Sequence, residues 1–249
     1  PDLRLLSETD STNSRLREAA LRGAPEGFVL LAGSQSAGRG RAGRSFYSPA
    51  TGLYLSLLLR PPHFSPGKAV QFTTMAAAAA CRAVEEISGR TAGIKWVNDL
   101  YLAGRKVGGI LTEASLELES GLLDYAVVGI GFNLYPPENG FPGDLSASAG
   151  SILSSPAGDA KNRLAAGFLN HFMNLYRSRE RGNYIDEYRR HSLALGQEIL
   201  VLSPEGARKA RALDIDDSCR LIVCYENGIT ESLSSGEIRI RMPEEKKLF

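Results

Sequence analysis

Residues 93–111 read GIKWVNDLYLAGRKVGGIL, and this stretch decides how the surrounding chain folds. Two short apolar runs flank Ala103-Gly104, a pair typical of a hairpin turn between antiparallel strands. Lys95 stands among apolar residues on the first expected strand, and Gly108-Gly109 lies inside a later one. Paired glycines within a strand let a ligand or another chain approach the backbone closely. The stretch therefore predicts a meander of antiparallel strands with an accessible face.

The same pattern continues further along the chain. We expect strands at 94–97, 100–102, 106–118 and 122–133, the last two joined by a turn at Ser120-Gly121. Residues 129–133 read GIGFN and repeat the glycine theme, so three neighbouring strands could form a floor for a flat ligand. Alternatively, each glycine pair marks a bulge or a tight packing contact, and Lys95 is a charge that protects a sheet edge from aggregation.

Helices are expected both before and after the meander in the chain. Asp10-Ser11-Thr12 is typical of a helix N-cap, since these side chains accept hydrogen bonds from free backbone N–H groups, and this helix should end at Gly23. Further helices are expected at 68–87, 161–179 and 184–191, strands at 27–32 and 53–59, and loops at 35–47 and 135–158. The order of elements predicts an α+β fold, in which helices pack on a mixed or antiparallel sheet.

The pattern changes after Leu195. Short strands separated by turn residues are expected at 199–202, 207–214, 221–224, 230–233 and 238–241. Such closely spaced strands are typical of a small barrel. The sequence therefore predicts two domains, residues 1–193 and residues 194–249.

Composition places the chain among ordinary globular proteins, with 43% hydrophobic and 23% charged residues in a length of 249. No apolar run of about 18 residues is present, so no membrane span is expected. The first residues lack a signal-peptide pattern. Pro1 stands where an initiator methionine would, which leaves a longer native chain open. Three cysteines without a CxxC motif favour a reducing, cytoplasmic compartment over a disulfide framework.

The charge is unevenly distributed. The net charge is only +1, which does not favour a polyanionic partner. Between Gly27 and Val84, however, there is no Asp or Glu, while Arg and Lys occur six times. A region with only positive charges suits an anionic ligand.

The motif GRGRAGR at residues 38–44 is the most informative one. It matches G-x-G-x-x-G, but a dinucleotide-binding turn needs a helix at once and an acidic residue about 20 positions later. Pro49 disfavours the helix, and no acid occurs before Glu85. The motif also nearly matches a P-loop, with Arg44 in place of its lysine. Three interpretations stay open: a flexible solvated loop, a lid whose arginines neutralise phosphate, and an RNA contact.

Taken together, these motifs resemble the biotin–protein ligase family, in its form without an N-terminal DNA-binding domain. The segments that carry the resemblance occur in the family's order and spacing, at residues 10–13, 35–44, 95–99, 106–113 and 131–133. The C-terminal segment, which ends in GEIRIR at residues 236–241, resembles its small C-terminal domain. The resemblance implies a catalytic domain like that of class II aminoacyl-tRNA synthetases and biotin ligases, followed by an SH3-like β-barrel.

The resemblance also implies an activity and a set of site residues. ATP would activate biotin as biotinyl-5′-AMP with release of pyrophosphate, and biotin would then pass to one lysine of a biotin carboxyl carrier protein, part of acetyl-CoA carboxylase or a related carboxylase. The implied catalytic residues are Lys95, Arg41 and Arg39. The implied biotin-binding residues are Ser11, Thr12, Asn13, Gln35, Gly38, Arg39, Gly40, Arg41, Lys95, Gly108 and Gly109. The implied ATP- or adenylate-binding residues are Arg41, Arg44, Phe46, Lys95, Asn98, Asn133 and Arg241. Mg²⁺ is expected together with ATP, with no protein ligands assigned.

Two departures from the family pattern and several questions about partners stay open. Phe46 stands where many relatives have Trp, and Val97 where they usually have Pro. Only nine residues precede Asp10, too few for a helix-turn-helix domain, so no DNA binding is expected. Monomer and homodimer are both compatible with the sequence. The rival functions are a lipoate or octanoate ligase of the same superfamily and, from a different class, a nucleic-acid-binding module that uses the acid-free region.

Overall fold

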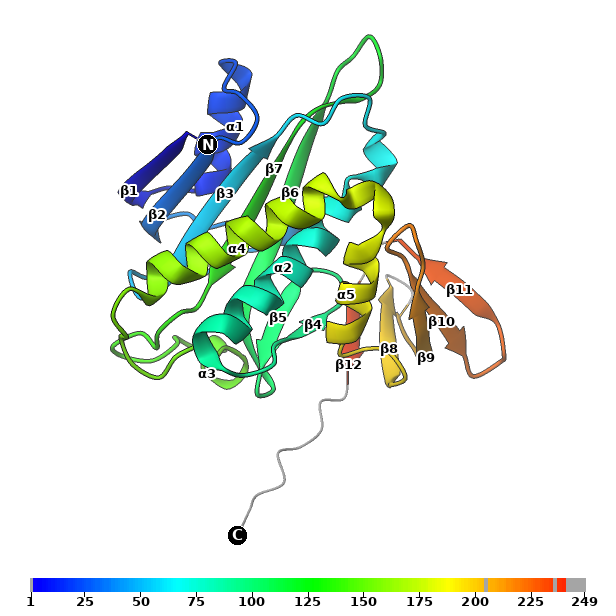
Figure 1. Ribbon diagram of the computed structural model, residues 1–249. Coiled ribbons are helices and arrows are strands. Elements are labelled where there is room, and N and C mark those ends of the chain that lie inside the picture. The colour runs from blue at the N-terminus through cyan, green and yellow to red at the C-terminus, as the bar shows by residue number, and fades with distance from the viewer. Residues whose placement is uncertain (1, 204–205, 235–236, 241–249) are drawn as a thin grey trace.

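Two sheets organise the chain in the computed structural model, which describes residues 2–203, 206–234 and, for the backbone alone, 237–240 (Figure 1). The first sheet has the strand order β1-β2-β3-β7-β6-β5-β4 and the second the order β11-β10-β9-β8-β12. The strands of the first sheet are β1 (Leu3–Thr9), β2 (Val29–Gln35), β3 (Leu53–Leu59), β4 (Gly93–Lys95), β5 (Asp99–Leu102), β6 (Arg105–Leu116) and β7 (Leu123–Phe132). Those of the second are β8 (Glu198–Ser203), β9 (Gly206–Ile215), β10 (Leu221–Tyr225), β11 (Thr230–Leu233) and β12 (Glu237–Ile240).

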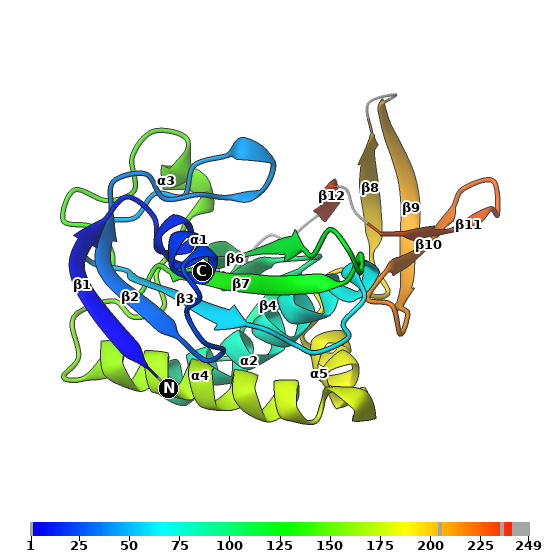
Figure 2. The same cartoon turned by 90° about the horizontal axis from the view of Figure 1, so that it is seen from above.

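Helices cover both faces of the first sheet, and the expected α+β fold is confirmed. The α-helices are α1 (Thr12–Leu21), α2 (Val70–Ser88), α3 (Leu145–Ser148), α4 (Ala160–Arg177) and α5 (Asn183–His191). The short 3₁₀ turns are η1 (Arg41–Gly43), η2 (Pro66–Lys68) and η3 (Arg179–Arg181). Figure 2 shows α2 and α4 on one face and α1 on the other. The loop that contains η1 lies on the same side as α1, so this side is left for the site.

Helix α2 is buried because it lies between the sheet and α4. Residues 76–80 are five consecutive alanines without exposed surface. Their small side chains let α4 pack closely. Phe168 of α4 makes an edge-on contact with Phe132 of β7 and a tilted contact with Phe172. Gly89 ends α2 in the left-handed conformation, with φ of 65°.

Helix α1 brings polar residues to the middle of the opposite face. Ser11 is its N-cap, as predicted, and its side chain accepts a hydrogen bond from the backbone N–H of Ser14. Leu16 and Ala20 pack on Phe28 and Leu58 in a separate apolar cluster beneath the helix. This packing fixes the first turn of α1 above strands β3 and β7.

The meander predicted from residues 93–133 is present, and its turn at Ala103-Gly104 has positive φ at both residues, 48° and 73°. Strand β1, in contrast, was not predicted. It pairs in parallel with β2, with Leu3 opposite Val29, and most of its residues are exposed. Strand β2 also continues to Gln35, beyond the predicted end at residue 32, because Ser34 and Gln35 pair with the end of β1. The predicted loop 135–158 contains the single turn of α3.

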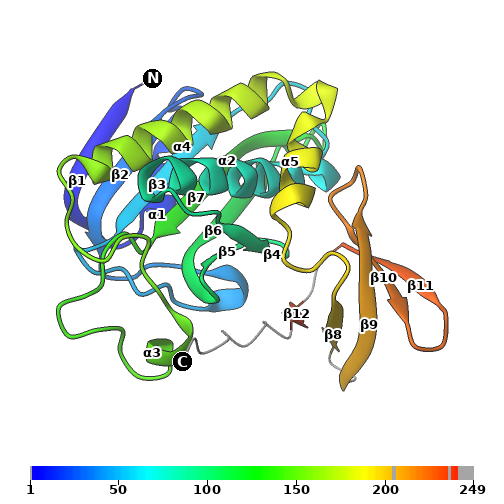
Figure 3. The same ribbon diagram turned by 60° about the horizontal axis from the view of Figure 1, so that its bottom comes forward.

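The five short strands expected after Leu195 are present and pair as an antiparallel sheet, which packs beside α5 (Figure 3). Its buried residues, among them Ile199 and Val223, belong to the same apolar cluster as Trp96 and α2. Arg189 of α5 joins the two parts by donating to the carbonyl oxygen of Ile215 and to Asp214. None of the helices in the described ranges is long and apolar enough to cross a bilayer.

Glu187 of α5 is a buried carboxylate that ties α5 to α2. Arg82 of α2 binds it through two hydrogen bonds, from Nε at 2.7 Å and from Nη2 at 2.6 Å. Arg190 also contacts it, and His191 lies 3.5 Å away. The hydrogen bonds and charge of Arg82 hold the pKa of Glu187 at about 2, well below its usual value of 4.5.

We predict that Glu187→Gln destabilises the protein by about 2 kcal/mol at pH 7, because it leaves the partly buried Arg82 without its anion. Since the folded-state pKa is lowered, the contribution of the carboxylate is complete above about pH 4.5 and is lost as the pH falls toward 2. Urea unfolding at pH 7 and pH 3.5 should therefore show a smaller difference between variant and parent at the lower pH. Glu119→Gln, at an exposed position, is the control. An equal difference at both pH values would contradict the assignment.

Candidate functional site

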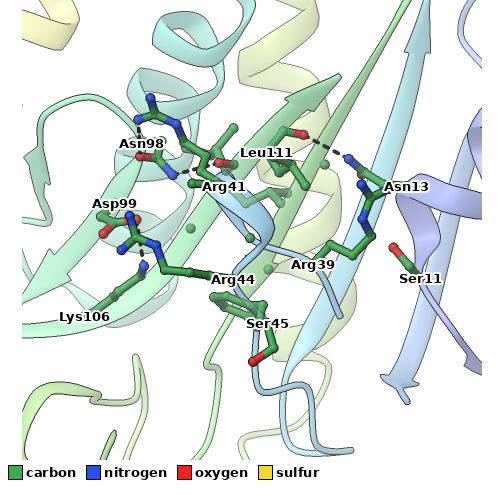
Figure 4. Close-up of a pocket in the computed structure, with 18 of the residues that line it drawn as sticks. Ser11, Asn13, Arg39, Arg41, Arg44, Ser45, Asn98, Asp99, Lys106 and Leu111 are labelled. Carbon is green, nitrogen blue, oxygen red and sulfur yellow. Dashed lines mark hydrogen bonds and ion pairs between the residues drawn. The ribbon is translucent and has the colours of Figure 1, made fainter. Parts of the chain in front are cut away.

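A pocket of about 650 Å³ lies over the face of the first sheet that carries α1. Its walls come from α1, the loop after β2, and the Lys95 segment, and its floor from β6 and β7. Leu202 and Ser203 of β8 also line it, so the second sheet contributes to the site. Figure 4 shows the side chains from these elements converging on one space. Motifs that are far apart in the sequence thus form a single cavity.

One end of the pocket is a hydrogen-bonded polar cluster. The Oε1 atom of Gln35 accepts from the backbone N–H of Thr12 at 2.9 Å and from its hydroxyl at 3.1 Å. The amide nitrogen of Gln35 donates to Ser48, which donates to the carbonyl oxygen of Phe46. The buried Ser56 hydroxyl lies 2.8 Å from Thr12 Oγ1 and 2.7 Å from Asn13 Oδ1. These bonds fix the orientation of the polar groups before any ligand arrives.

The floor is made of glycines that permit close contacts. A Cβ atom at Gly129 would lie 1.9 Å from Asn13 Oδ1, and one at Gly131 would lie 2.5 Å from the ring of Phe46. A Cβ at Gly109 would meet the same ring at 3.4 Å. Glycines of two strands, β6 and β7, thus line the floor, rather than of the three strands expected, and they place an amide and an aromatic ring directly on the sheet. Gly93 of the third strand, β4, packs against Leu193 instead.

The GRGRAGR motif forms a narrow hairpin over this floor. Arg39 pairs with Ser45 across its base, and Phe46 N–H donates to the carbonyl oxygen of Gly38. The tip has positive φ at Ala42 and Gly43. Pro49 follows, and no helix opens after the glycines, in agreement with the argument against a dinucleotide-binding turn.

Positive charge dominates the described part of the pocket lining. The described lining contains five basic side chains and a single carboxylate, that of Asp99. The basic side chains are those of Arg39, Arg41, Arg44, Lys95 and Lys106. Arg41 donates to Asn98 Oδ1 at 3.1 Å, and Asn98 in turn donates to the carbonyl oxygen of Ile110 (Figure 4). Lys106 Nζ lies 2.7 Å from Asp99 Oδ1. The surplus of positive charge makes the pocket suitable for an anionic ligand.

The Lys95 segment is held from behind by α5. The Tyr188 hydroxyl, completely buried, donates to the carbonyl oxygen of Val97 at 3.1 Å. Burial raises the pKa of Tyr188 well above its usual value, so the phenol keeps its proton. Lys95 Nζ lies 6.0 Å from the centre of the Tyr101 ring. Lys95 thus ends the edge strand β4, where it is half-buried, lines the pocket and is supported from behind.

Most of the predicted site residues line this pocket; these are Ser11, Thr12, Asn13, Gln35, Arg39, Gly40, Arg41, Arg44, Phe46, Lys95, Asn98 and Gly109. Three others do not. A Cβ at Gly38 would meet Phe46 O and Ser48 Oγ, and one at Gly108 would meet Gly131 O, so both glycines serve backbone packing. Asn133 is buried and donates to the carbonyl oxygen of Lys106. Arg241 lies outside the described residues.

Several residues of the site were not predicted. Asp99 and Lys106 lie inside quoted motifs, and their opposite charges at adjacent strands could have suggested the pair. Gly129 and Gly131 were noticed as a theme without being assigned to the site. Ser56, in contrast, is a serine in an apolar strand, and no local signal in the sequence marks it as the partner of Thr12 and Asn13.

Comparison with known proteins identifies the family. The family model described as the biotin/lipoate A/B protein ligase family matches residues 5–133, which include all the motifs discussed above apart from the C-terminal segment. The chain belongs to this family. A second model, the biotin protein ligase C-terminal domain, matches residues 194–241, so the ligase resemblance extends to the second sheet.

Individual relatives support the same family assignment. The chain is 33% identical over 234 residues to a bifunctional ligase/repressor BirA of Bacillus subtilis, covering 90% of this chain and 70% of the relative. It is 30% identical over 247 residues to a biotin–[acetyl-CoA-carboxylase] ligase of Mycobacterium tuberculosis, covering 95% of this chain and 88% of the relative. A solved biotin protein ligase from Aquifex aeolicus, in complex with biotin and ATP, superposes with a TM-score of 0.77 at 26% identity, covering 96% of this chain and 98% of that one.

We predict that Gly129→Ala destabilises this ligase by about 2 kcal/mol, because the added Cβ would overlap the Asn13 amide and force the first turn of α1 outward. Gly67→Ala is the matched control, since a Cβ there meets only Ser65 Oγ at 4.0 Å and the backbone needs no positive φ. Denaturant unfolding of both variants measures the difference. Equal stabilities would show that Asn13 adapts at no cost.

Proposed function

We propose that the protein is an ATP-dependent biotin–protein ligase that forms biotinyl-5′-AMP and transfers biotin to a lysine of a biotin carboxyl carrier protein. The observation that carries the proposal is the pocket itself. It joins a polar end suited to a small ring system with a strongly basic end suited to a carboxylate and phosphates. Biotin has a polar ring system at one end and a carboxylate at the other, so it matches this division.

The polar cluster is the proposed site of the biotin ring. Thr12 and Gln35 already hydrogen-bond to each other, and each keeps further donor or acceptor capacity for a ligand. Ser11 and Asn13 lie beside them at the start of α1. The presence of lipoate in the family's name makes lipoate the nearest alternative substrate. The match of residues 194–241 to a biotin-specific C-terminal domain favours biotin.

The basic end is the proposed site of adenylation. A carboxylate oxygen of biotin attacks the α-phosphorus of ATP, a P–O bond forms, and the bond to the departing pyrophosphate breaks. The carboxylate and the triphosphate repel each other, and Lys95, Arg39 and Arg41 offset this repulsion from fixed positions around the pocket. The Phe46 ring is assigned to stacking on the adenine. Arg44 and Asn98, which line the same pocket, are assigned to contacts with the nucleotide.

The second half-reaction needs no nucleophile of the enzyme. The amine of the carrier lysine attacks the acyl carbon of biotinyl-5′-AMP, AMP leaves, and the amine gives up a proton. No cysteine or histidine lines the described part of the pocket. The hairpin of residues 38–46 over the floor limits access of water to the mixed anhydride, which is the lid interpretation of the GRGRAGR motif.

The described part of the pocket offers few ligands for a divalent cation. Asp99 is the single carboxylate among the described lining residues, and no group of three or more metal-ligating side chains occurs in the described chain. Mg²⁺ commonly binds through phosphate oxygens, water and one or two carboxylates, so ATP and water would supply most of its ligands. Asp99, whose Oδ1 lies 2.7 Å from Lys106 Nζ, is the one described lining carboxylate that could join them. When bound, it supplies charge neutralisation of the phosphates.

The partner and the compartment are further parts of the proposal. The acetyl-CoA-carboxylase ligase named above supports a carrier subunit of such a carboxylase as the protein substrate. A cytoplasmic location, the absence of DNA binding and a monomeric or homodimeric state remain predictions from the sequence. The exposed Leu3 and Leu5 on edge strand β1 would be covered in a homodimer that pairs sheet edges.

We predict that the protein releases about one pyrophosphate per chain with biotin and Mg·ATP alone, and many per chain when a biotin carboxyl carrier domain is added. The first amount reflects retention of the adenylate and the second its consumption. Release with lipoate or octanoate but not with biotin would keep the adenylation chemistry and change the substrate. Absence of release with all three acids would refute the proposal.

Lys95→Ala should lower the rate of biotin-dependent pyrophosphate exchange into ATP by about 100-fold, because one fixed positive charge at the reacting phosphate is removed. Lys68→Ala, an exposed lysine at η2 outside the pocket, is the control and should keep the parent rate. A Lys95→Ala variant with the parent rate would contradict the role assigned to this residue.

A further inference from the structure

Glu113 of β6 is an acidic residue that contacts the lid hairpin but does not line the pocket. Its Oε1 atom lies 3.1 Å from Nη1 of Arg39, and its Oε2 atom lies 3.3 Å from the same nitrogen. Because no Asp or Glu occurs between Gly27 and Val84, the hairpin cannot supply its own counter-charge. The acceptor for Arg39 comes instead from a strand of the sheet.

The Glu113 carboxylate is itself fixed from the buried side. Asn13 Nδ2 donates to Oε2 at 2.9 Å and to the carbonyl oxygen of Leu111 at 3.1 Å. The other end of the Asn13 amide accepts from the buried Ser56 hydroxyl. The Glu113 side chain is only 18% exposed. The Asn13 amide is therefore oriented at both ends, and it holds Oε2 in place. Arg39 Nη1 donates to this same oxygen and lies close to Oε1 as well.

Arg17 of α1 is the second arginine on this carboxylate, with Nη1 3.3 Å from Oε1. It is 46% exposed and does not line the pocket. The ion pair with Arg17 therefore serves the attachment of α1, whereas the one with Arg39 reaches the lining of the pocket. This difference separates a structural role of Glu113 from a role in the reaction.

We propose that Glu113 is a positioning residue for adenylate retention: it orients the Arg39 guanidinium where it lines the pocket beside Asn13 and thereby holds the base of the lid hairpin against β6 (Figure 4). The inference rests on the proposed function, because it assigns Arg39 to the phosphate of the adenylate. Arg39 has five N–H donors, so it can keep a bond to Glu113 and present other donors to an anionic ligand. An arginine fixed in this way loses less conformational freedom when the ligand binds.

The test is a double-mutant cycle on the release rate of biotinol-5′-AMP, a phosphodiester that keeps the phosphate but cannot acylate a lysine. Glu113→Gln keeps an oxygen that can accept from Asn13 and removes the charge that holds Arg39. We expect Glu113→Gln to accelerate release about tenfold, as does Arg39→Ala, and the double variant to exceed Arg39→Ala by less than about twofold. A second variant, Glu113→Asp, keeps the charge with a shorter reach and should give an intermediate acceleration, which preserves the test if Glu113→Gln folds poorly.

Two controls separate this role from support of the fold. Arg17→Ala removes the other arginine from the same carboxylate, and Glu119→Gln makes the same chemical change at an exposed site. Both should keep the parent release rate, whatever they do to the melting temperature. The inference alone would be overturned if the acceleration of release in the double variant were the product of the two single accelerations. It would also be overturned if Arg17→Ala accelerated release as much as Glu113→Gln does. Failure of the parent protein to bind biotinol-5′-AMP would overturn the proposed function as well.

Discussion

Helix α1 and the lid hairpin approach the first sheet closely where strand β7 has glycines, and the rest of the site depends on this close approach. At Gly129 and Gly131 the backbone of β7 is in contact with the Asn13 amide and the Phe46 ring, and any larger residue would separate them. Because Asn13 is held there, Thr12 and Gln35 are held beside it. The orientation of the polar groups is thus a consequence of packing density rather than of any one strong bond.

Charge in the pocket follows from the same arrangement. The hairpin and the Lys95 segment bring basic side chains together, and the carboxylates that balance them, Asp99 and Glu113, come from β5 and β6. Mutual repulsion among like charges disfavours the site when it is empty, and an anionic ligand relieves this repulsion. A triphosphate followed by an adenylate is the kind of ligand for which such a site is preorganised.

The sequence predicted the parts of the molecule whose signals are local. The N-cap at Ser11, the alanine-rich α2 and the turn at Ala103-Gly104 were predicted because neighbouring residues determine them. Strand β1 was not predicted because an exposed edge strand has no apolar alternation and takes its conformation from β2, about 26 residues later in the register.

The candidate site shows the same division. Its motif residues were found from spacing and from the family resemblance, and most of them line one pocket. The residues that support them were not found, because Ser56 and Glu113 meet their partners across 43 to 100 positions in the chain. Such contacts depend on the assembled sheet order, which no local pattern encodes.

Because β8 contributes to the pocket, the pocket can be completed only late in the synthesis of the chain on the ribosome. Leu202 and Ser203 complete the wall of a cavity whose other described lining residues all precede position 132, and Ile199 and Val201 of the same strand share one apolar cluster with the larger sheet. A nascent chain that has released α1 through β7 still lacks part of this wall and part of its core. Synthesis must therefore pass residue 203 before the wall of the pocket is complete, so a prematurely terminated chain lacks part of the site.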